Sequence, residues 1–131
     1  MNHTVKKQFV TAEHTTADGV HWDLMLETDG TLRSWRLNTP PQEIKRRPVP
    51  AERIFDHSLR FLTYEGPVQD GTGQVKIVDH GTYQIIEQTK TSLVVAFEGQ
   101  TLSGTFRLRR LGKKQQWELE QFNQDSPNKC I

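Results

Sequence analysis

The sequence predicts an all-β protein, a compact single-domain β-barrel of about eight short antiparallel strands with little helix. Apolar and polar residues alternate with a period of two in several short runs, as in strands with one buried face. Turn signals rich in Gly, Asp and Pro separate these runs at regular intervals. No stretch has the apolar spacing of a sizeable amphipathic helix. We expect a closed or nearly closed barrel because one small open sheet would leave exposed edges.

The first part of the chain carries the clearest strand pattern. Residues 8–13 predict a first strand, which delivers His14 from a loop just before the second strand. Residues 20–27 alternate strictly, with Val20, Trp22, Leu24 and Leu26 on one face and His21, Asp23, Met25 and Glu27 on the other. Asp29-Gly30 predicts a two-residue type I′ turn. That turn sets the register of a hairpin in which Leu24 faces Trp35 and Asp23 faces Arg36.

The remaining elements are shorter. Four prolines predict an irregular connection over residues 39–52. Asp56-His57 is expected at a turn between apolar pieces. Four more strands are predicted over residues 74–79, 82–87, 91–97 and 102–111, and a last one over residues 116–122. We expect a flexible segment over residues 1–8, the barrel domain over 9–122 and a disordered tail over 123–131.

Composition narrows the classes of function. Seventeen Lys and Arg residues nearly balance sixteen Asp and Glu residues, which argues against a generally basic nucleic-acid coat but not against a local basic patch. The one cysteine, Cys130, excludes a disulfide framework within one chain and a thiolate metal site. No apolar run approaches the length of a membrane span, and the N-terminus has no apolar signal-type segment. We therefore expect a cytoplasmic protein that does not act on membranes.

Three polar residues have the spacing of a metal site. His21 and Asp23 share one face of the predicted hairpin, and His14 arrives beside them. Imidazole and carboxylate bind divalent ions, and this nitrogen–oxygen set suits manganese or zinc. The spacing alone favours a simpler interpretation, in which the three are surface residues and Asp23 pairs with Arg36.

Two further features have a structural and a functional interpretation. The run Lys45-Arg46-Arg47 is the strongest charge cluster, and a solvated face is its leading interpretation. The alternative is a contact to the phosphate backbone of a nucleic acid. His57 considered alone is interpreted as a hydrogen-bonded structural residue. A catalytic role would depend on which residues lie beside it.

Several motifs together resemble a known family. They are Glu13-His14, the strand of residues 21–27, residues 30–37, Asp56-His57, residues 64–67, and Asp79 with residues 81–83. In this order they are similar to the 3′-phosphoesterase module of bacterial DNA ligase D. The resemblance covers roughly residues 9–122, almost the whole chain.

The resemblance implies a compact β-barrel that depends on manganese and trims 3′ phosphates or 3′ ribonucleotides from DNA before ligation. It implies that His14, His21 and Asp23 are metal ligands and that His57 acts at the scissile phosphate. DNA 3′ ends, including RNA-containing ends, are then the expected substrate, and DNA repair proteins are candidate partners. The family pattern has an arginine, a glutamate and a tyrosine where this sequence has Met25, Phe55 and Phe61. These departures indicate a divergent stand-alone branch.

Three functions remain open at this stage. The first is a metal-dependent phosphoesterase in which Arg36, facing Asp23, binds phosphate in place of the missing arginine. The second is a catalytically impaired module that binds nucleic-acid ends or a repair partner and keeps the fold. The third is a metal-independent interaction domain.

Overall fold

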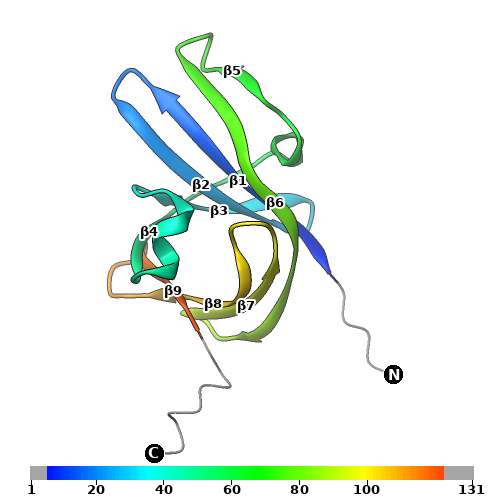
Figure 1. Ribbon diagram of the computed structural model, residues 1–131, viewed down its shortest axis with the longest axis vertical. Coiled ribbons are helices and arrows are strands. Elements are labelled where there is room, and N and C mark those ends of the chain that lie inside the picture. The colour runs from blue at the N-terminus through cyan, green and yellow to red at the C-terminus, as the bar shows by residue number, and fades with distance from the viewer. Residues whose placement is uncertain (1–5, 123–131) are drawn as a thin grey trace, which may run out of the picture.

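Nine strands and two short 3-10 helices make up residues 6–122, which are the residues described by the computed structural model (Figure 1). In chain order they are β1 (Lys7–Thr16), β2 (Gly19–Thr28), β3 (Thr31–Leu37), η1 (Pro41–Lys45), β4 (Val49–His57), η2 (Leu59–Leu62), β5 (Gly66–Val68), β6 (Gly73–Gln88), β7 (Ser92–Glu98), β8 (Ser103–Arg110) and β9 (Gln116–Gln121). Residues 1–5 of the expected flexible segment and the expected tail 123–131 lie outside this range, and β1 begins at Lys7.

Eight of these strands close into an antiparallel barrel. Hydrogen bonding runs in the order β1-β2-β3-β4-β9-β8-β7-β6, and β6 returns to pair with β1. β5 lies outside the ring and pairs with the first residues of β6. In Figure 1 the end of β1, the start of β2, the start of β6 and the short β5 project together above the closed part of the barrel. The predicted all-β barrel is confirmed.

The β2–β3 hairpin has the predicted register. Asp29 and Gly30 both have positive φ, as a type I′ turn requires. Leu24 then pairs with Trp35, and Asp23 pairs with Arg36. The inner face joins the main core, in which Leu24, Leu26, Trp35 and Leu37 pack with residues of β7, β8 and β9.

The outer face of this hairpin is not simply exposed to solvent. Met25 is only 2% exposed and packs in a second apolar cluster with Val10, Ala12 and Leu32. Phe61 from η2 packs against this cluster from outside. The segment from η2 to β5 therefore covers part of the sheet face. Met25 is buried, although the alternation pattern placed it on the same face as the polar residues.

Three local predictions were wrong. Residues 74–79 and 82–87 belong to one continuous strand, β6. Gly81 does not break it: a Cβ there would lie 2.0 Å from the carbonyl oxygen of Glu98, so the glycine allows a close backbone approach. The irregular connection is shorter than expected because β4 begins at Val49 and carries the exposed Pro50, which a strand tolerates at its start. His57 is the last residue of β4 rather than part of a turn.

No helix in the described part of the chain has the length and apolar character needed to cross a membrane.

Asp79 is a buried carboxylate that fixes the β7–β8 hairpin. It is 3% exposed and accepts hydrogen bonds from the backbone amides of Gln100 and Leu102, each at 2.8 Å. Removing the acceptor would leave the buried N–H of Leu102 and the partly buried N–H of Gln100 without this partner, which is costly.

We predict that Asp79→Ala lowers the free energy of unfolding by about 2–4 kcal/mol, because two charge-assisted hydrogen bonds are lost. Urea denaturation measures the change. The control is Asp29→Asn, which should change stability by less than about 0.5 kcal/mol, because Asn suits the positive φ of this turn residue. Asp29→Ala would strain the turn and is not a matched control. Equal stability of the Asp79 variant and the wild type would contradict this assignment.

Candidate metal and phosphate site

Three neighbouring strands present polar side chains on the same outer face of the barrel. His14 is in β1 rather than in the expected loop, and it pairs directly with His21 of β2. Asp23 lies two residues along β2 and pairs with Arg36 of β3. Directly opposed residues bring their Cβ atoms to within about 4.5–5.5 Å, so strand pairing alone gathers these groups.

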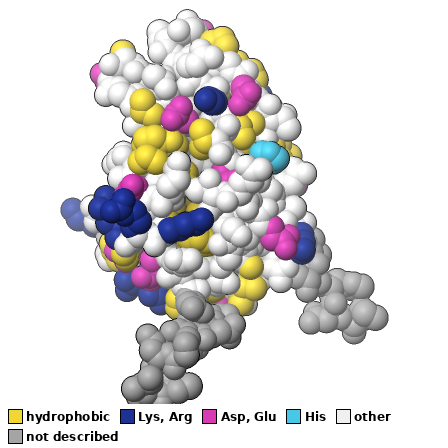
Figure 2. All heavy atoms as spheres, in the orientation of Figure 1, with side chains coloured by type: hydrophobic (Ala, Val, Ile, Leu, Met, Phe, Trp, Pro, Cys, Tyr) yellow, Lys and Arg dark blue, Asp and Glu magenta, His cyan; other side chains and the backbone are white. Residues whose placement is uncertain are grey.

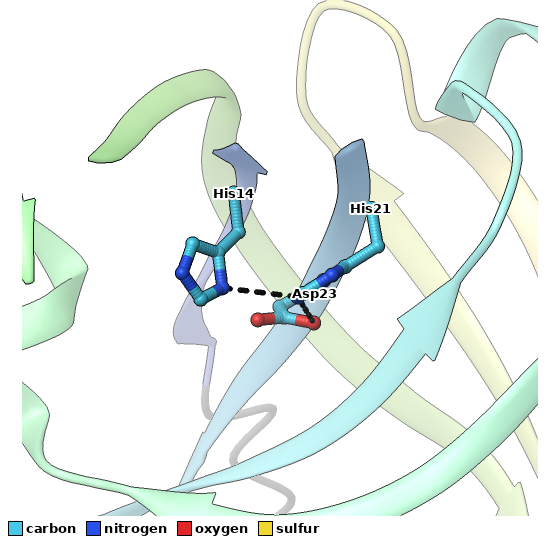
Figure 3. A group of neighbouring side chains, drawn as sticks. All are labelled: His14, His21 and Asp23. Atoms are coloured by element: carbon cyan, nitrogen blue, oxygen red, sulfur yellow. Dashed lines mark hydrogen bonds and ion pairs between the residues drawn. The ribbon is translucent and has the colours of Figure 1, made fainter. Parts of the chain in front are cut away.

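The side chains of His14, His21 and Asp23 converge on one point (Figure 3). The Nδ1 atom of His14 lies 3.0 Å from the Nε2 atom of His21, and this Nε2 lies 3.5 Å from Oδ1 of Asp23. One candidate ligand atom from each residue falls within 4.8 Å of the others. Bonds of about 2.0–2.2 Å to a shared ion place its ligand atoms roughly 3–3.5 Å apart, so the cluster could hold a divalent metal.

The pairing of Asp23 also suits a cation. Its side chain is 6% exposed, and its contacts to His21 and Arg36 are both 3.5 Å long. This is the long limit of a hydrogen bond, and a buried carboxylate is costly unless it is closely paired. A cation between the carboxylate and the two imidazoles would supply the missing charge.

His14 is oriented by the space around it. Its Nδ1 faces the cluster, and its buried Nε2 has no hydrogen-bond partner among the described residues. A Cβ on Gly73 would lie 2.8 Å from that Nε2, so the glycine at the start of β6 makes room for the imidazole. When Nδ1 binds a metal, the imidazole proton belongs on Nε2, beside Gly73.

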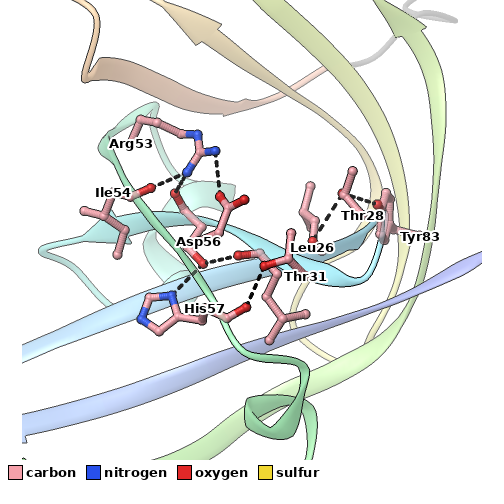
Figure 4. A network of polar contacts seen from close by, with 10 residues as sticks. Leu26, Thr28, Thr31, Arg53, Ile54, Asp56, His57 and Tyr83 are labelled. Carbon is pink, nitrogen blue, oxygen red and sulfur yellow. Dashed lines mark hydrogen bonds and ion pairs between the residues drawn. The ribbon is translucent and has the colours of Figure 1, made fainter.

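His57 lines the same cavity as His14 and Asp23, and its imidazole contacts Ser34. Figure 4 shows His57 in a network of polar contacts that also includes Thr31 and Asp56. The fully buried Ser34 hydroxyl donates to the carbonyl of Leu32 at 2.9 Å and lies 2.8 Å from Nδ1 of His57. A hydroxyl has one proton, so Ser34 must accept the Nδ1–H of His57 if it donates to Leu32. This tautomer leaves a lone pair on Nε2 of His57, which can accept a proton or meet a ligand.

Burial keeps two of these imidazoles neutral. It is the main cause that lowers the pKa of His14 below its ordinary value of 6.5, and the neighbouring His21 lowers it further. Burial likewise lowers the pKa of His57, with Asp23 acting in the opposite direction. Both histidines are therefore uncharged at neutral pH, which is the form that binds a metal.

A cavity of about 330 Å³ joins these residues. His14, Asp23, Arg36 and His57 line its polar side. Its apolar side is formed by Ala12, Met25, Phe55, Phe61, Val68 and Val75, and Gln69 completes the rim. The three family departures, Met25, Phe55 and Phe61, all line this one cavity.

The predicted cations separate into two groups. Arg36 lines the cavity and approaches Asp23 through Nε alone, so its guanidinium is not locked in a two-pronged pair. Lys45, Arg46 and Arg47 are exposed at the end of η1 and do not line the cavity. Figure 2 shows Lys and Arg side chains gathered on the side where η1 and β4 lie.

Sequence reasoning missed the supporting residues. Ser34 lay in the matched stretch of residues 30–37, but nothing in the local pattern predicted its contact with His57. Gly73 read only as a turn signal, and its contact with His14 depends on the pairing of β1 with β6. Phe55 was noted as a departure, without any sign that its ring stacks on His57.

Comparison with known proteins agrees with this geometry. The chain is 34% identical over 117 residues to the multifunctional non-homologous end joining protein LigD of Pseudomonas aeruginosa, covering 79% of this chain. It is also 34% identical over 112 residues to the LigD proteins of Mycobacterium bovis and Mycobacterium tuberculosis, covering 78% of this chain. The matched region is 14% of the length of each of these relatives. Residues 12–110 match the family described as the DNA Ligase D 3′-phosphoesterase domain, and the chain belongs to that family.

Proposed function

We propose that the protein is a metal-dependent phosphoesterase that processes 3′ phosphate or 3′ ribonucleotide ends of DNA during repair. The observation that carries this proposal is the convergence of His14, His21 and Asp23 in the same cavity region as His57. Membership of the 3′-phosphoesterase family supports the same substrate class. DNA 3′ ends, including RNA-containing ends, are the proposed substrate, and DNA repair proteins are proposed partners.

We propose His14, His21 and Asp23 as the ligands of a divalent ion, manganese in the first place and zinc as the alternative. When bound, such an ion neutralises phosphate charge and polarises the P–O bond. His57 contacts the scissile phosphate, and Ser34 fixes the tautomer that leaves its Nε2 free. Arg36 binds the phosphate oxygens that the family arginine would bind, since Met25 cannot do so.

The remaining cations are proposed to act outside the cavity. Lys45, Arg46 and Arg47 are exposed, so they would meet the nucleic-acid backbone beyond the terminal nucleotide without reading its sequence. We also propose a cytoplasmic location, because a chain with a single cysteine forms no internal disulfide and so needs no oxidising compartment.

A second candidate is a module that binds DNA 3′ ends or a repair partner without turnover. It is favoured by Met25, Phe55 and Phe61, which replace three polar groups of the family pattern on the wall of the cavity. The second candidate keeps the fold, with or without the metal site, and lacks the chemical step.

We predict that calorimetry with manganese and with zinc will show a site of micromolar affinity or better. Asp23→Asn removes a ligand charge and should weaken binding by more than the roughly 10–100-fold that loss of an outer partner costs. Asp56→Asn is the matched control, because Asp56 neighbours His57 and pairs with Arg53 at 2.9 Å, outside the ligand cluster. Equal affinity in the wild type and Asp23→Asn would rule out this site.

We predict manganese-dependent removal of the 3′ phosphate or 3′ ribonucleotide from 5′-labelled DNA, with loss of turnover in EDTA. His57→Ala should lower the rate by at least ~100-fold, as expected for a side chain that transfers a proton or stabilises the reacting phosphate. His80→Ala, an exposed histidine of β6, is the control and should behave as the wild type. Tight end binding without any turnover would favour the second candidate.

We predict that Arg36→Lys keeps its melting temperature and metal affinity but loses affinity for DNA with a 3′ phosphate. Lysine keeps the charge beside Asp23 and lacks the planar fork that engages two phosphate oxygens. Arg36 contacts Asp23 only through Nε, at 3.5 Å, and lysine keeps a positive charge beside the buried carboxylate, so stability should not depend on the fork. Unchanged DNA affinity in Arg36→Lys would show that the guanidinium fork does not bind the phosphate, and the metal and His57 would then be its only proposed contacts.

A further inference from the structure

An aromatic side chain stands exposed at the mouth of the cavity. Phe55 is 72% exposed, the most exposed large apolar residue of the described chain, although it lies in the regular strand β4. It lines the cavity together with His57. Because Phe55 lines the cavity and is also open to solvent, its ring is accessible to a ligand held there.

One face of this ring is already covered. Phe55 and His57 are two residues apart on β4, and their rings stack with centroids 4.8 Å apart and planes inclined by 28°. The exposed fraction of Phe55 shows that the opposite face is open. The pair therefore presents a flat aromatic surface beside the polar groups of the site.

The surface is supported from below. The ring of Phe61 meets His57 edge-on at 5.7 Å, and Tyr64 meets Phe61 edge-on at 5.8 Å. Phe61 packs against the second apolar cluster, and Ser34 holds the His57 ring at Nδ1. The His57 ring that stacks on Phe55 is therefore held in place. Binding a flat group on the open face of Phe55 then orders few side chains, which reduces the entropy lost on binding.

The cavity has two chemically different sides. Asp23 and Arg36 provide charge and His14 adds a neutral imidazole, whereas Met25, Phe55, Phe61 and Val68 provide an apolar wall. A nucleotide has the same division, with a charged phosphate at one end and a flat base at the other. Bases of single-stranded nucleic acid stack on exposed aromatic side chains without sequence preference.

We propose that Phe55, backed by His57, stacks with the unpaired base of the terminal nucleotide at a DNA 3′ end. The proposal rests on the proposed 3′-end function and adds to it a substrate preference: an end whose last base is free of a pairing partner. Pairing and stacking hold the last base of a duplex in one orientation, whereas an unpaired base can turn toward Phe55, so the ring favours frayed or single-stranded ends.

The test compares two single-stranded DNA probes that end in a nonhydrolysable 3′ phosphonate. One carries a normal terminal base and the other an abasic terminal sugar. Binding is measured by fluorescence anisotropy in manganese for the wild type, Phe55→Ala, Phe55→Tyr and the control Ile86→Ala. Ile86 is an exposed apolar residue of β6 that does not line the cavity.

We expect the wild type to bind the base-bearing probe roughly 10- to 100-fold more tightly than the abasic probe. Phe55→Ala should lose this preference by weakening only the base-bearing complex, and Phe55→Tyr should restore it. Ile86→Ala should match the wild type. The proposal is overturned if the wild type does not distinguish the probes, if it binds neither, or if Phe55→Ala weakens both complexes equally.

Turnover of 3′-phosphate DNA is measured separately, so the two ideas can fail independently. Base preference that depends on Phe55, without turnover, supports the stacking surface and removes the phosphoesterase assignment. Normal turnover without base preference removes the stacking surface alone.

Discussion

The pairing register of β1, β2 and β3 is the constraint on which the site depends. In a strand, neighbouring side chains point to opposite faces, so a shift by one residue would send His21 and Asp23 into the barrel core. It would also bring Leu24 and Leu26 to the outside. The Asp29-Gly30 turn and the apolar inner face both oppose that shift, and together they fix Arg36 opposite Asp23.

The segment from η2 to the start of β6 covers this sheet face and so encloses the cavity. Phe61 and Val68 stand over one side of it, and Gly73 leaves room for His14. Their cover removes water from Asp23 and lowers the pKa of His14 and His57. Burial therefore places neutral imidazoles beside a carboxylate that lacks a close partner, and a divalent cation could satisfy both.

The sequence predicted the parts of the fold that local pattern determines. Alternation and the Asp-Gly turn were enough for the β2–β3 register, and so for the closeness of His21, Asp23 and Arg36. The errors came from contacts between distant segments. The pattern predicted a strand break at Gly81, but this glycine allows the backbone of Glu98 to approach closely. The pattern also placed Met25 on the solvent face, but Phe61 covers it. The bond from Ser34 to His57 depends on an irregular register between β3 and β4, which no short-range pattern encodes.

The exchange of polar for apolar groups changes how the cavity can hold a substrate. Met25 pairs with Ser34, so Arg36 lies one diagonal step away on the same face, close enough for a long side chain to reach the same phosphate. The apolar wall of Met25, Phe55 and Phe61 also excludes water, and charge interactions are stronger where water is absent. Fewer charged groups at the wall would then suffice for the proposed phosphate, while the proposed aromatic surface would contribute affinity that salt does not screen. The same replacements that separate this chain from the family pattern would thus give the cavity a second, apolar means of recognising the proposed nucleotide end.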